Sequence, residues 1–259
     1  MKFLKPGLFI SLQLALLISS QGLAKDQGYS IIKKSLELDE GFKDNVVKAQ
    51  MTLRDKSGQS SVRQFTVKTL EGADEEDKTI LTFEAPKDIK GTALLTHNKK
   101  NSDNLQWLYL PTIRRVKRIS TGNKSGPFVG SEFAFEDLVS HQLEKYSYKK
   151  VADSVANGIS CYVVEQTPKD KSSGYAKQIV WIDKSEHRLQ KVHYFDKKLA
   201  HFKTLELSGY KKFKKKFWRP AKSEMTNLVS GKSTIIAWTE YKFGQNLKDR
   251  SFTKAALKR

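Results

Sequence analysis

Histidine, serine and acidic side chains are the residues of this chain whose types could support hydrolysis or metal binding. The five histidines are scattered, without a His-Glu-x-x-His motif or a His/Cys ligand spacing. His141 follows Ser140 and lies near Glu136 and Asp137, but no Gly-x-Ser-x-Gly motif marks a nucleophile. On a helix, Glu136 and Asp137 would point about 100° apart, which is unsuited to paired acid–base catalysis. We expect them to cap a turn or pair with nearby arginines, and we predict a non-enzymatic protein without catalytic residues, metal site or cofactor.

A single cysteine, Cys161, lies inside the apolar run Ile159–Val164. One cysteine allows no intramolecular disulfide, even in an oxidising compartment. A cysteine in such a run is typically a small buried apolar residue. We therefore predict a buried thiol and not a nucleophile.

The first 24 residues have the layout of a secretory signal peptide. Lys2 and Lys5 precede an apolar run of eleven residues, and Gly22 and Ala24 place small residues before a cleavage site. The run is shorter than the roughly 20 apolar residues that span a bilayer. No cysteine follows the run to accept a lipid. We predict a cleaved leader over residues 1–24 and a soluble secreted chain over residues 25–259 that forms one domain.

The chain is strongly basic, with a formal net charge of +19. Removal of the two leader lysines leaves +17, and residues 201–259 hold 15 lysines and arginines against 4 acidic residues. The run Lys211–Lys216 is the densest part of this excess. Such a charge indicates nucleic acid in a cytosolic protein, but a secreted protein does not meet that partner. Anionic lipid headgroups or an acidic protein fit the secreted address better.

The periodicity of the chain predicts one short helix followed by strands. Apolar residues spaced three to four apart predict an amphipathic helix over Tyr29–Leu38. From residue 47 onward, apolar and polar residues alternate as in half-buried strands, and turn sequences such as Asn157-Gly158 separate the segments. Residues 133–143 could carry a second short helix. The predicted strands cover residues 47–53, 62–70, 79–84, 92–97, 105–110, 114–120, 146–152, 159–166, 176–183, 189–196, 202–210, 217–227 and 233–243.

Several of these strands are apolar on both faces. In Trp107-Leu108-Tyr109-Leu110 the two aromatic residues face one way and the two leucines the other. Because an antiparallel sheet normally exposes one face to water, the second apolar face requires another sheet or a ligand. A curled antiparallel meander with a helix across its mouth meets this requirement and encloses an apolar cavity.

Spaced motifs across the chain resemble the LolA-like family of outer membrane lipoprotein-sorting proteins. The central motifs are Trp-Leu-Tyr-Leu-Pro at residues 107–111, Arg-Arg-Val-Lys-Arg-Ile at residues 114–119 and Phe-Val-Gly-Ser-Glu-Phe-Ala-Phe-Glu-Asp-Leu at residues 128–138. Lys-Gly-Thr-Ala-Leu-Leu at residues 90–95 and Cys-Tyr-Val-Val-Glu at residues 161–165 follow the family's order. The resemblance covers essentially the whole secreted chain.

The resemblance implies a mainly β fold: a single unclosed antiparallel half-barrel of about 11 strands, with a few short helices covering its concave face. It implies a periplasmic carrier of a lipid, a lipoprotein acyl chain or another hydrophobic cargo, working with an inner-membrane transporter of the RND/MMPL type. Enclosure of an acyl chain gains ~0.8 kcal/mol for each buried CH₂, and aromatic side chains supply the lining at low entropic cost. We predict that the cavity is lined by Phe83, Leu95, Trp107, Tyr109, Phe128, Phe133, Phe135 and Trp181.

Cationic side chains follow the second motif. Arg114, Arg115 and Arg118 alternate with apolar residues, so one face of that strand could contact an anionic headgroup or a partner. The alternative to a lipid carrier is a periplasmic module that binds a polyanion or a protein through the basic run Lys211–Lys216, without a lipid cavity. High salt would weaken such adhesion but not acyl-chain capture.

Overall fold

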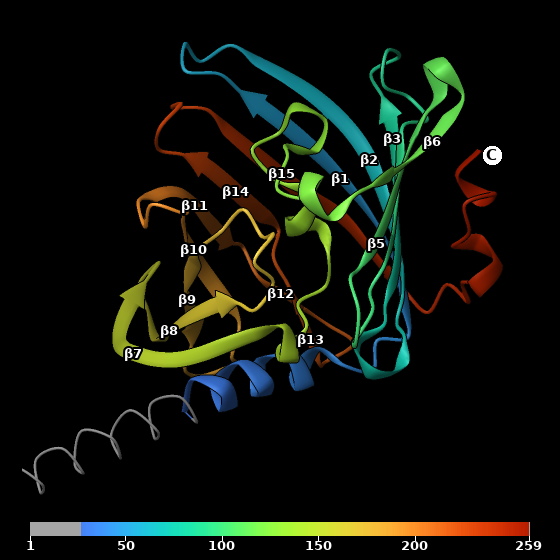
Figure 1. Ribbon diagram of the computed structural model, residues 1–259. Helices are drawn as coiled ribbons and strands as arrows, with labels where there is room; N and C mark the ends of the chain where they lie inside the picture. Colours follow the sequence, from blue (N-terminus) through green and yellow to red (C-terminus); the bar gives the residue numbers. More distant parts are fainter. Residues whose placement is uncertain (1–26, 259) are drawn as a thin grey trace, which may run out of the picture.

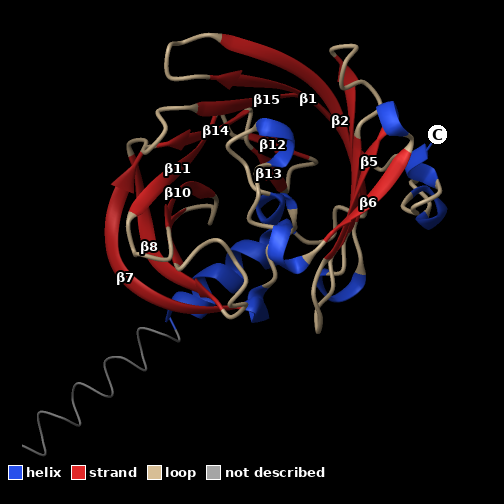
Figure 2. Cartoon of the chain, turned by 45° about the horizontal axis from the view of Figure 1, so that its top comes forward, coloured by secondary structure: helices blue, strands red, loops and turns tan. Residues whose placement is uncertain are grey.

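Thirteen strands form one antiparallel sheet that curves around a concave side without closing (Figures 1 and 2). The computed structural model describes residues 27–258, so the predicted leader lies outside the described residues. The spatial order of the strands is β6-β5-β4-β3-β2-β1-β15-β14-β11-β10-β9-β8-β7, and β12 and β13 pair separately. The strands are β1 (Asp44–Arg54), β2 (Ser60–Leu70), β3 (Lys78–Ala85), β4 (Ala93–His97), β5 (Leu105–Leu110), β6 (Arg115–Ile119), β7 (Tyr146–Ala156), β8 (Ile159–Pro168), β9 (Lys177–Asp183), β10 (Leu189–Phe195), β11 (His201–Ser208), β12 (Lys211–Phe213), β13 (Phe217–Arg219), β14 (Lys222–Asn227) and β15 (Ser233–Phe243).

This architecture confirms the predicted mainly β half-barrel, and its sheet has 13 strands where the family resemblance implied about 11. Strand β1 illustrates why the sequence folds this way. Ala49 and Met51 are buried on the concave side, whereas Lys48 and Gln50, which alternate with them, are exposed. Because the side-chain period is two, any shift of register would expose this apolar row, and the pattern fixes the pairing of β1 with β2 and β15.

The two edges of the sheet, β6 and β7, follow each other in the chain but lie at opposite ends of the strand order. The residues that join them, 120–145, therefore run from one edge to the other across the concave side (Figure 2). We call residues 120–145 the bridging segment. It contains short 3₁₀ turns at Phe135–Leu138 and Leu143–Lys145 in place of the predicted helix over residues 133–143.

One α-helix, over residues 27–39, lies across one end of the concave side (Figure 1). Its apolar side, including Ile32 and Leu36, packs into the main core, as the predicted amphipathic pattern requires. A Cβ atom on Gly28 would lie 2.7 Å from the backbone nitrogen of Lys150, so glycine permits the close approach of the helix to β7. Ser35 Oγ donates a hydrogen bond to the carbonyl oxygen of His187 at 2.7 Å and fixes the other end of the helix.

The C-terminal residues cover the convex face of β4 and β5. Phe252 and Leu257 are buried there in a second apolar cluster with Leu95 and Trp107. His97 Nε2 lies 2.8 Å from the carbonyl oxygen of Phe252. The second apolar face of this part of the sheet is thus covered by the chain itself, and not by another sheet or a ligand as the sequence led us to expect.

Two departures from the predicted strands occur in the lysine-rich region. The predicted strand over residues 217–227 is divided at Pro220, which lacks a backbone N–H, into β13 and β14. The run Lys211–Lys216, which follows the predicted strand over residues 202–210, contributes β12 and the turn to β13 and so forms a hairpin. Within residues 27–258, no helix combines the length and the apolar character needed to cross a bilayer.

Candidate functional site

The bridging segment fills the concave side with phenylalanine side chains. Phe128 is fully buried and stacks on Phe83 of β3, with ring centroids 5.7 Å apart. Phe135 meets Phe128 edge to face at 5.6 Å, and Phe65 meets Phe83 in the same way at 5.9 Å. Phe133 is buried in the same cluster. The interior of the half-barrel is therefore closed by aromatic side chains of a segment that has little regular secondary structure.

Carboxylates anchor the bridging segment to the loop between β8 and β9. Asp137 accepts hydrogen bonds from the backbone nitrogen of Ala134 at 2.7 Å and from Tyr175 Oη at 2.9 Å. Burial raises the pKa of Asp137 to about 6 despite these bonds. Glu136 accepts hydrogen bonds from Ser173 Oγ and the backbone nitrogen of Gly174. The carboxylates cap turns as expected, but their partners are not the nearby arginines, so that part of the prediction was wrong.

Glu132 fixes the middle of the bridging segment to the sheet. Its backbone nitrogen donates to Thr234 Oγ1 at 3.0 Å, and its carboxylate accepts a hydrogen bond from Asn227 Nδ2 at 2.7 Å. Lys203 Nζ donates to its carbonyl oxygen at 2.7 Å. These are polar contacts at the rim of an apolar cluster, so a few hydrogen bonds position the segment that closes the interior.

The structure divides the eight predicted cavity residues between the two faces of the sheet. Phe83, Phe128, Phe133 and Phe135 lie together on the concave side. Leu95, Trp107 and Tyr109 lie on the convex side against the C-terminal residues.

Trp181 also faces away from the concave cluster, because its neighbours Val180 and Ile182 belong to that cluster and successive side chains of a strand alternate. Its ring lies 4.5 Å from the ring of His193, and Lys191 Nζ lies 4.7 Å from its centroid. Trp181 is thus separated from the four phenylalanines of the interior.

The three predicted headgroup contacts, Arg114, Arg115 and Arg118, are exposed at the edge of the sheet. Arg114 occupies the turn between β5 and β6 with a φ of 49°, and the other two lie on edge strand β6. None of the eleven predicted site residues lines the large pocket described next.

A pocket of about 1360 Å³ opens at the end of the half-barrel where the helix lies. Six segments far apart in the sequence form it: the end of the helix with residues 40–45, the β2–β3 loop, Lys100 of the β4–β5 loop, residues 140–144, the β9–β10 turn and the β12–β13 hairpin. Our reading of the sequence missed this pocket. The acidic run Glu71–Asp77, unusual in so basic a chain, was the available signal.

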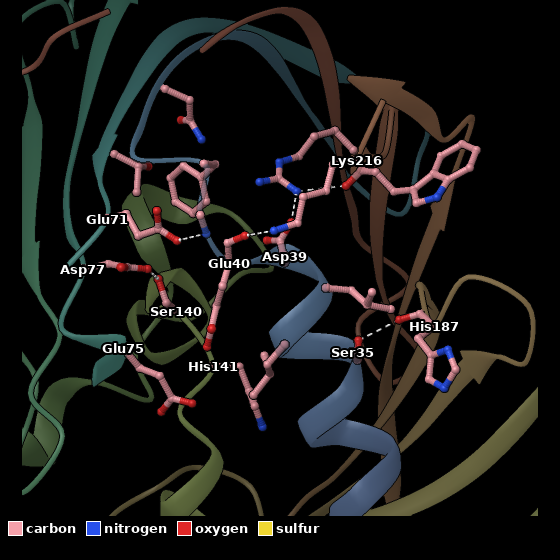
Figure 3. A pocket seen from close by; sticks show the side chains of 18 of the residues that line it. Ser35, Asp39, Glu40, Glu71, Glu75, Asp77, Ser140, His141, His187 and Lys216 are labelled. Carbon is pink, nitrogen blue, oxygen red and sulfur yellow. Dashed lines mark hydrogen bonds and ion pairs between the residues drawn. The ribbon is translucent and has the colours of Figure 1, made fainter. Parts of the chain in front are cut away.

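Charged side chains of both signs line this pocket (Figure 3). On the side of the β12–β13 hairpin, Arg188 lies 4.5 Å from the ring centroid of Trp218, and Trp218 Nε1 donates to Glu186 at 2.9 Å. Lys216 donates to the backbone carbonyl of Glu40, which joins the hairpin to the end of the helix. The hairpin is thus held as a wall of the pocket.

Ser140 and His141 line the pocket but do not form a catalytic pair. Ser140 Oγ donates to Asp77 at 2.9 Å, whereas His141 Nε2 lies 2.8 Å from Tyr148 Oη. Tyr148 Oη in turn donates to the carbonyl oxygen of Leu143 at 3.0 Å. Since the serine and the histidine have separate partners, the contacts support structural roles for both. Burial of Cys161 agrees with its predicted role as a small core residue.

Burial of His141 predicts a specific acid sensitivity. Burial lowers the pKa of His141 to about 4, so the stability that its neutral form contributes is complete above the unfolded pKa of about 6.5 and is lost as the pH falls toward 4. This loss is on the order of 2–3 kcal/mol. We expect His141→Gln, which removes this titration, to flatten the decline in urea-unfolding free energy between pH 7 and pH 4. An unchanged decline would show that the ring is solvated in solution.

Comparisons with known proteins found solved structures that resemble nearly the whole chain. A domain of an outer membrane lipoprotein-sorting protein from Vibrio parahaemolyticus superposes with a TM-score of 0.89 and 42% sequence identity, covering 91% of this chain and 100% of that one. A DUF1329 family protein from Desulfovibrio piger gives a TM-score of 0.85 at 27% identity, covering 90% and 99%. A LolA superfamily protein from Nitrosomonas europaea gives 0.71 at 20% identity, covering 88% and 97%, and this likeness concerns the fold alone.

A family model described as an uncharacterized protein matches residues 75–259. No curated protein matches the sequence significantly. The matched region includes the bridging segment and every strand from β3 onward.

Proposed function

Because the chain belongs to a family of outer membrane lipoprotein-sorting proteins, we propose that it is a non-enzymatic periplasmic carrier of a hydrophobic cargo. The cargo is a lipid or an acylated molecule, and its apolar chain occupies the concave side of the half-barrel. The observation that carries this proposal is the closure of that side by phenylalanines of an irregular segment. Such a segment can be displaced without breaking a strand ladder.

The energies of the two occupants of the concave side are similar. Burial of Phe128, Phe133 and Phe135 stabilises the closed form by about 1.5–3 kcal/mol for each side chain. An acyl chain of about 16 carbons that replaces them gains on the order of 10 kcal/mol at ~0.8 kcal/mol per CH₂. The cargo can therefore offset the displacement of the bridging segment, and the segment can in turn promote release of the cargo.

The basic surface determines where such a carrier would work. The lysines of residues 211–216 are exposed on the β12–β13 hairpin, and Arg114, Arg115 and Arg118 are exposed on a separate edge. These sites suit an anionic membrane surface and the periplasmic part of an RND/MMPL-type transporter. We propose that a signal peptide exports the chain and that it then works with these two partners. Nucleic acid has no role in this proposal.

Lipid that co-purifies with the protein tests the proposal. We expect the chain, expressed with its leader and purified from the periplasm, to carry lipid in native mass spectrometry. Phe83→Asp, which puts a charge on the concave wall of the sheet and not on the bridging segment, should reduce bound lipid at least about tenfold, because a desolvated carboxylate opposes acyl-chain burial.

Trp107→Asp is the matched control, since it places the same charge on the convex face. It should retain its lipid. Circular dichroism establishes that both variants fold, and Phe83→Ser replaces Phe83→Asp if the latter does not. Wild-type protein without lipid, or a folded concave variant with a normal load, would contradict the proposal.

A further inference from the structure

The acidic side of the large pocket is unusual in this protein. Four carboxylates that line it, Glu40, Glu71, Glu75 and Asp77, have no side-chain nitrogen of a lysine or arginine within 4.0 Å in the part of the chain that the structure describes. Other acidic residues of the same loop are paired, Asp74 with Lys100 and Glu76 with Lys99. In a chain with an excess of 19 positive charges, these carboxylates without a cationic partner create a local negative potential.

The groups that compensate these carboxylates are backbone N–H groups and one hydroxyl. Glu71 accepts hydrogen bonds from the backbone nitrogens of Gly41 and Lys43, both at 2.6 Å. Asp77 accepts hydrogen bonds from the backbone nitrogen of Gly72 and from Ser140 Oγ, and Glu75 accepts one from the backbone nitrogen of Leu143. Burial raises the pKa of Glu75 and of Asp77, and the nearby charges of Glu40 and Glu71 add to this effect. A cation placed among them would relieve both the desolvation and the mutual repulsion.

A second, independent observation comes from Asn45 on β1. The residue is 6% exposed, lines the same pocket, and its Oδ1 atom has no hydrogen-bond partner. Asn45 is an even number of residues from Ala49 and Met51 along β1, so its side chain lies on the same concave face as these two core residues. A buried amide oxygen without a donor is destabilising, so the pocket holds an acceptor that a ligand's N–H group would satisfy.

The opposite wall has the complementary charge. Lys212, Lys215 and Lys216 of the β12–β13 hairpin line the pocket. Figure 3 shows Glu71, Asp77 and Glu75 along one side, Glu40 near the centre and Lys216 on the other side. A pocket with an acidic and a basic wall matches a group that carries an ammonium and a phosphate.

We propose that this pocket binds the polar end of a zwitterionic lipid headgroup, with a primary ammonium group among Glu40, Glu71, Glu75 and Asp77 and the phosphate toward the hairpin lysines. The proposal rests on the carrier function, because it assigns the polar end of the cargo. An ammonium has three donors, which suit two or more carboxylates and the free oxygen of Asn45.

The test compares two lysolipids with the same acyl chain, lysophosphatidylethanolamine and lysophosphatidylglycerol, by calorimetry with delipidated protein. Both carry a phosphate, and the first alone carries an ammonium. We expect the ethanolamine lipid to bind at least about tenfold more tightly, the effect of a hydrogen-bonded charge. Glu75→Gln combined with Asp77→Asn should bring the two affinities to within about twofold of each other.

Glu76→Gln is the matched control, because Glu76 lies in the same loop but is paired with Lys99 and does not line the pocket. It should keep the preference. Thermal unfolding should show that the double variant is at least as stable as the wild type, since it loses like charges. Equal affinities in the wild type, or a preference that survives in the double variant, would overturn the proposal.

A protein that binds neither lysolipid would contradict the carrier function, and soluble phosphoethanolamine then tests the pocket by itself. NMR shift changes confined to residues 40–45 and 71–77 would support the ammonium site. Their absence would exclude it.

Discussion

A disulfide that fixes the bridging segment to the sheet should abolish cargo loading. The backbone nitrogen of Glu132 lies 3.0 Å from Thr234 Oγ1, which brings the two residues close enough for a designed cysteine pair. If cargo replaces Phe128 and Phe133 on the concave side, the segment must move away from β15. We therefore expect oxidised Glu132→Cys/Thr234→Cys protein to take up at least about tenfold less lipid than the wild type, because a covalent tether excludes the open form.

The same protein under reducing conditions is the matched control and should recover its loading. The native thiol of Cys161 is buried, so it does not compete for the designed pair. The single variants Glu132→Cys and Thr234→Cys separate the tether from the loss of the hydrogen bond between these residues. Equal lipid uptake by oxidised and reduced protein would show that cargo does not enter by displacing the bridging segment.

Alternation along the strands was sufficient to predict the sheet, but not the assignment of its faces. Leu95 of β4 and Trp107 of β5 are directly paired on adjacent strands. Their side chains therefore lie on the same face of the sheet, as the alternation implies. The pattern cannot say which face is concave, because curvature depends on the twist of the whole sheet and on what packs against it. The C-terminal residue Phe252, far away in the sequence, covers the face that we had assigned to a ligand.

The large pocket was beyond prediction for a related reason. It joins residues as distant as Asn45, Glu75 and Lys215, and no short motif spans them. The lysine run suggested a solvated surface, because consecutive charges conceal the short alternation of β12 and β13 around Phe213 and Phe217. Local sequence therefore predicted the elements, whereas the site depends on how their ends meet.

Replacement of Asp183 should cause the largest loss of stability of any single polar substitution that we consider. Asp183 is fully buried at the end of β9 and accepts hydrogen bonds from the backbone nitrogen of Glu186 at 2.6 Å, Arg188 Nε at 2.5 Å and Gln190 Nε2 at 3.1 Å. Burial by itself would raise the pKa of Asp183, but the bonds from Glu186 and Arg188 hold that pKa below its usual value.

Removal of this carboxylate leaves several buried donors and a guanidinium without a partner, so we expect Asp183→Ala to lower the free energy of unfolding by about 3–5 kcal/mol. Urea unfolding at pH 7 measures this loss. Asp196→Ala is the matched control: Asp196 also accepts backbone hydrogen bonds in a hairpin turn, from Lys198 and Ala200, but is only partly buried. Its removal should cost only about 1 kcal/mol.

The pH dependence of the unfolding free energy distinguishes the effect of the charge of Asp183 from the effect of its side-chain shape. Because the folded pKa is depressed, the stability from this carboxylate is present above the unfolded pKa of about 3.9 and is lost as the pH falls through the folded value. Asp183→Asn should be destabilised at pH 7 and should lose less further stability on acidification than the wild type.

Arg188 also lies over the rings of Tyr210 and Trp218, so release of Arg188 should loosen the hairpin wall of the pocket. Equal unfolding free energies for Asp183→Ala and Asp196→Ala would show that the turn does not depend on the buried ion pair.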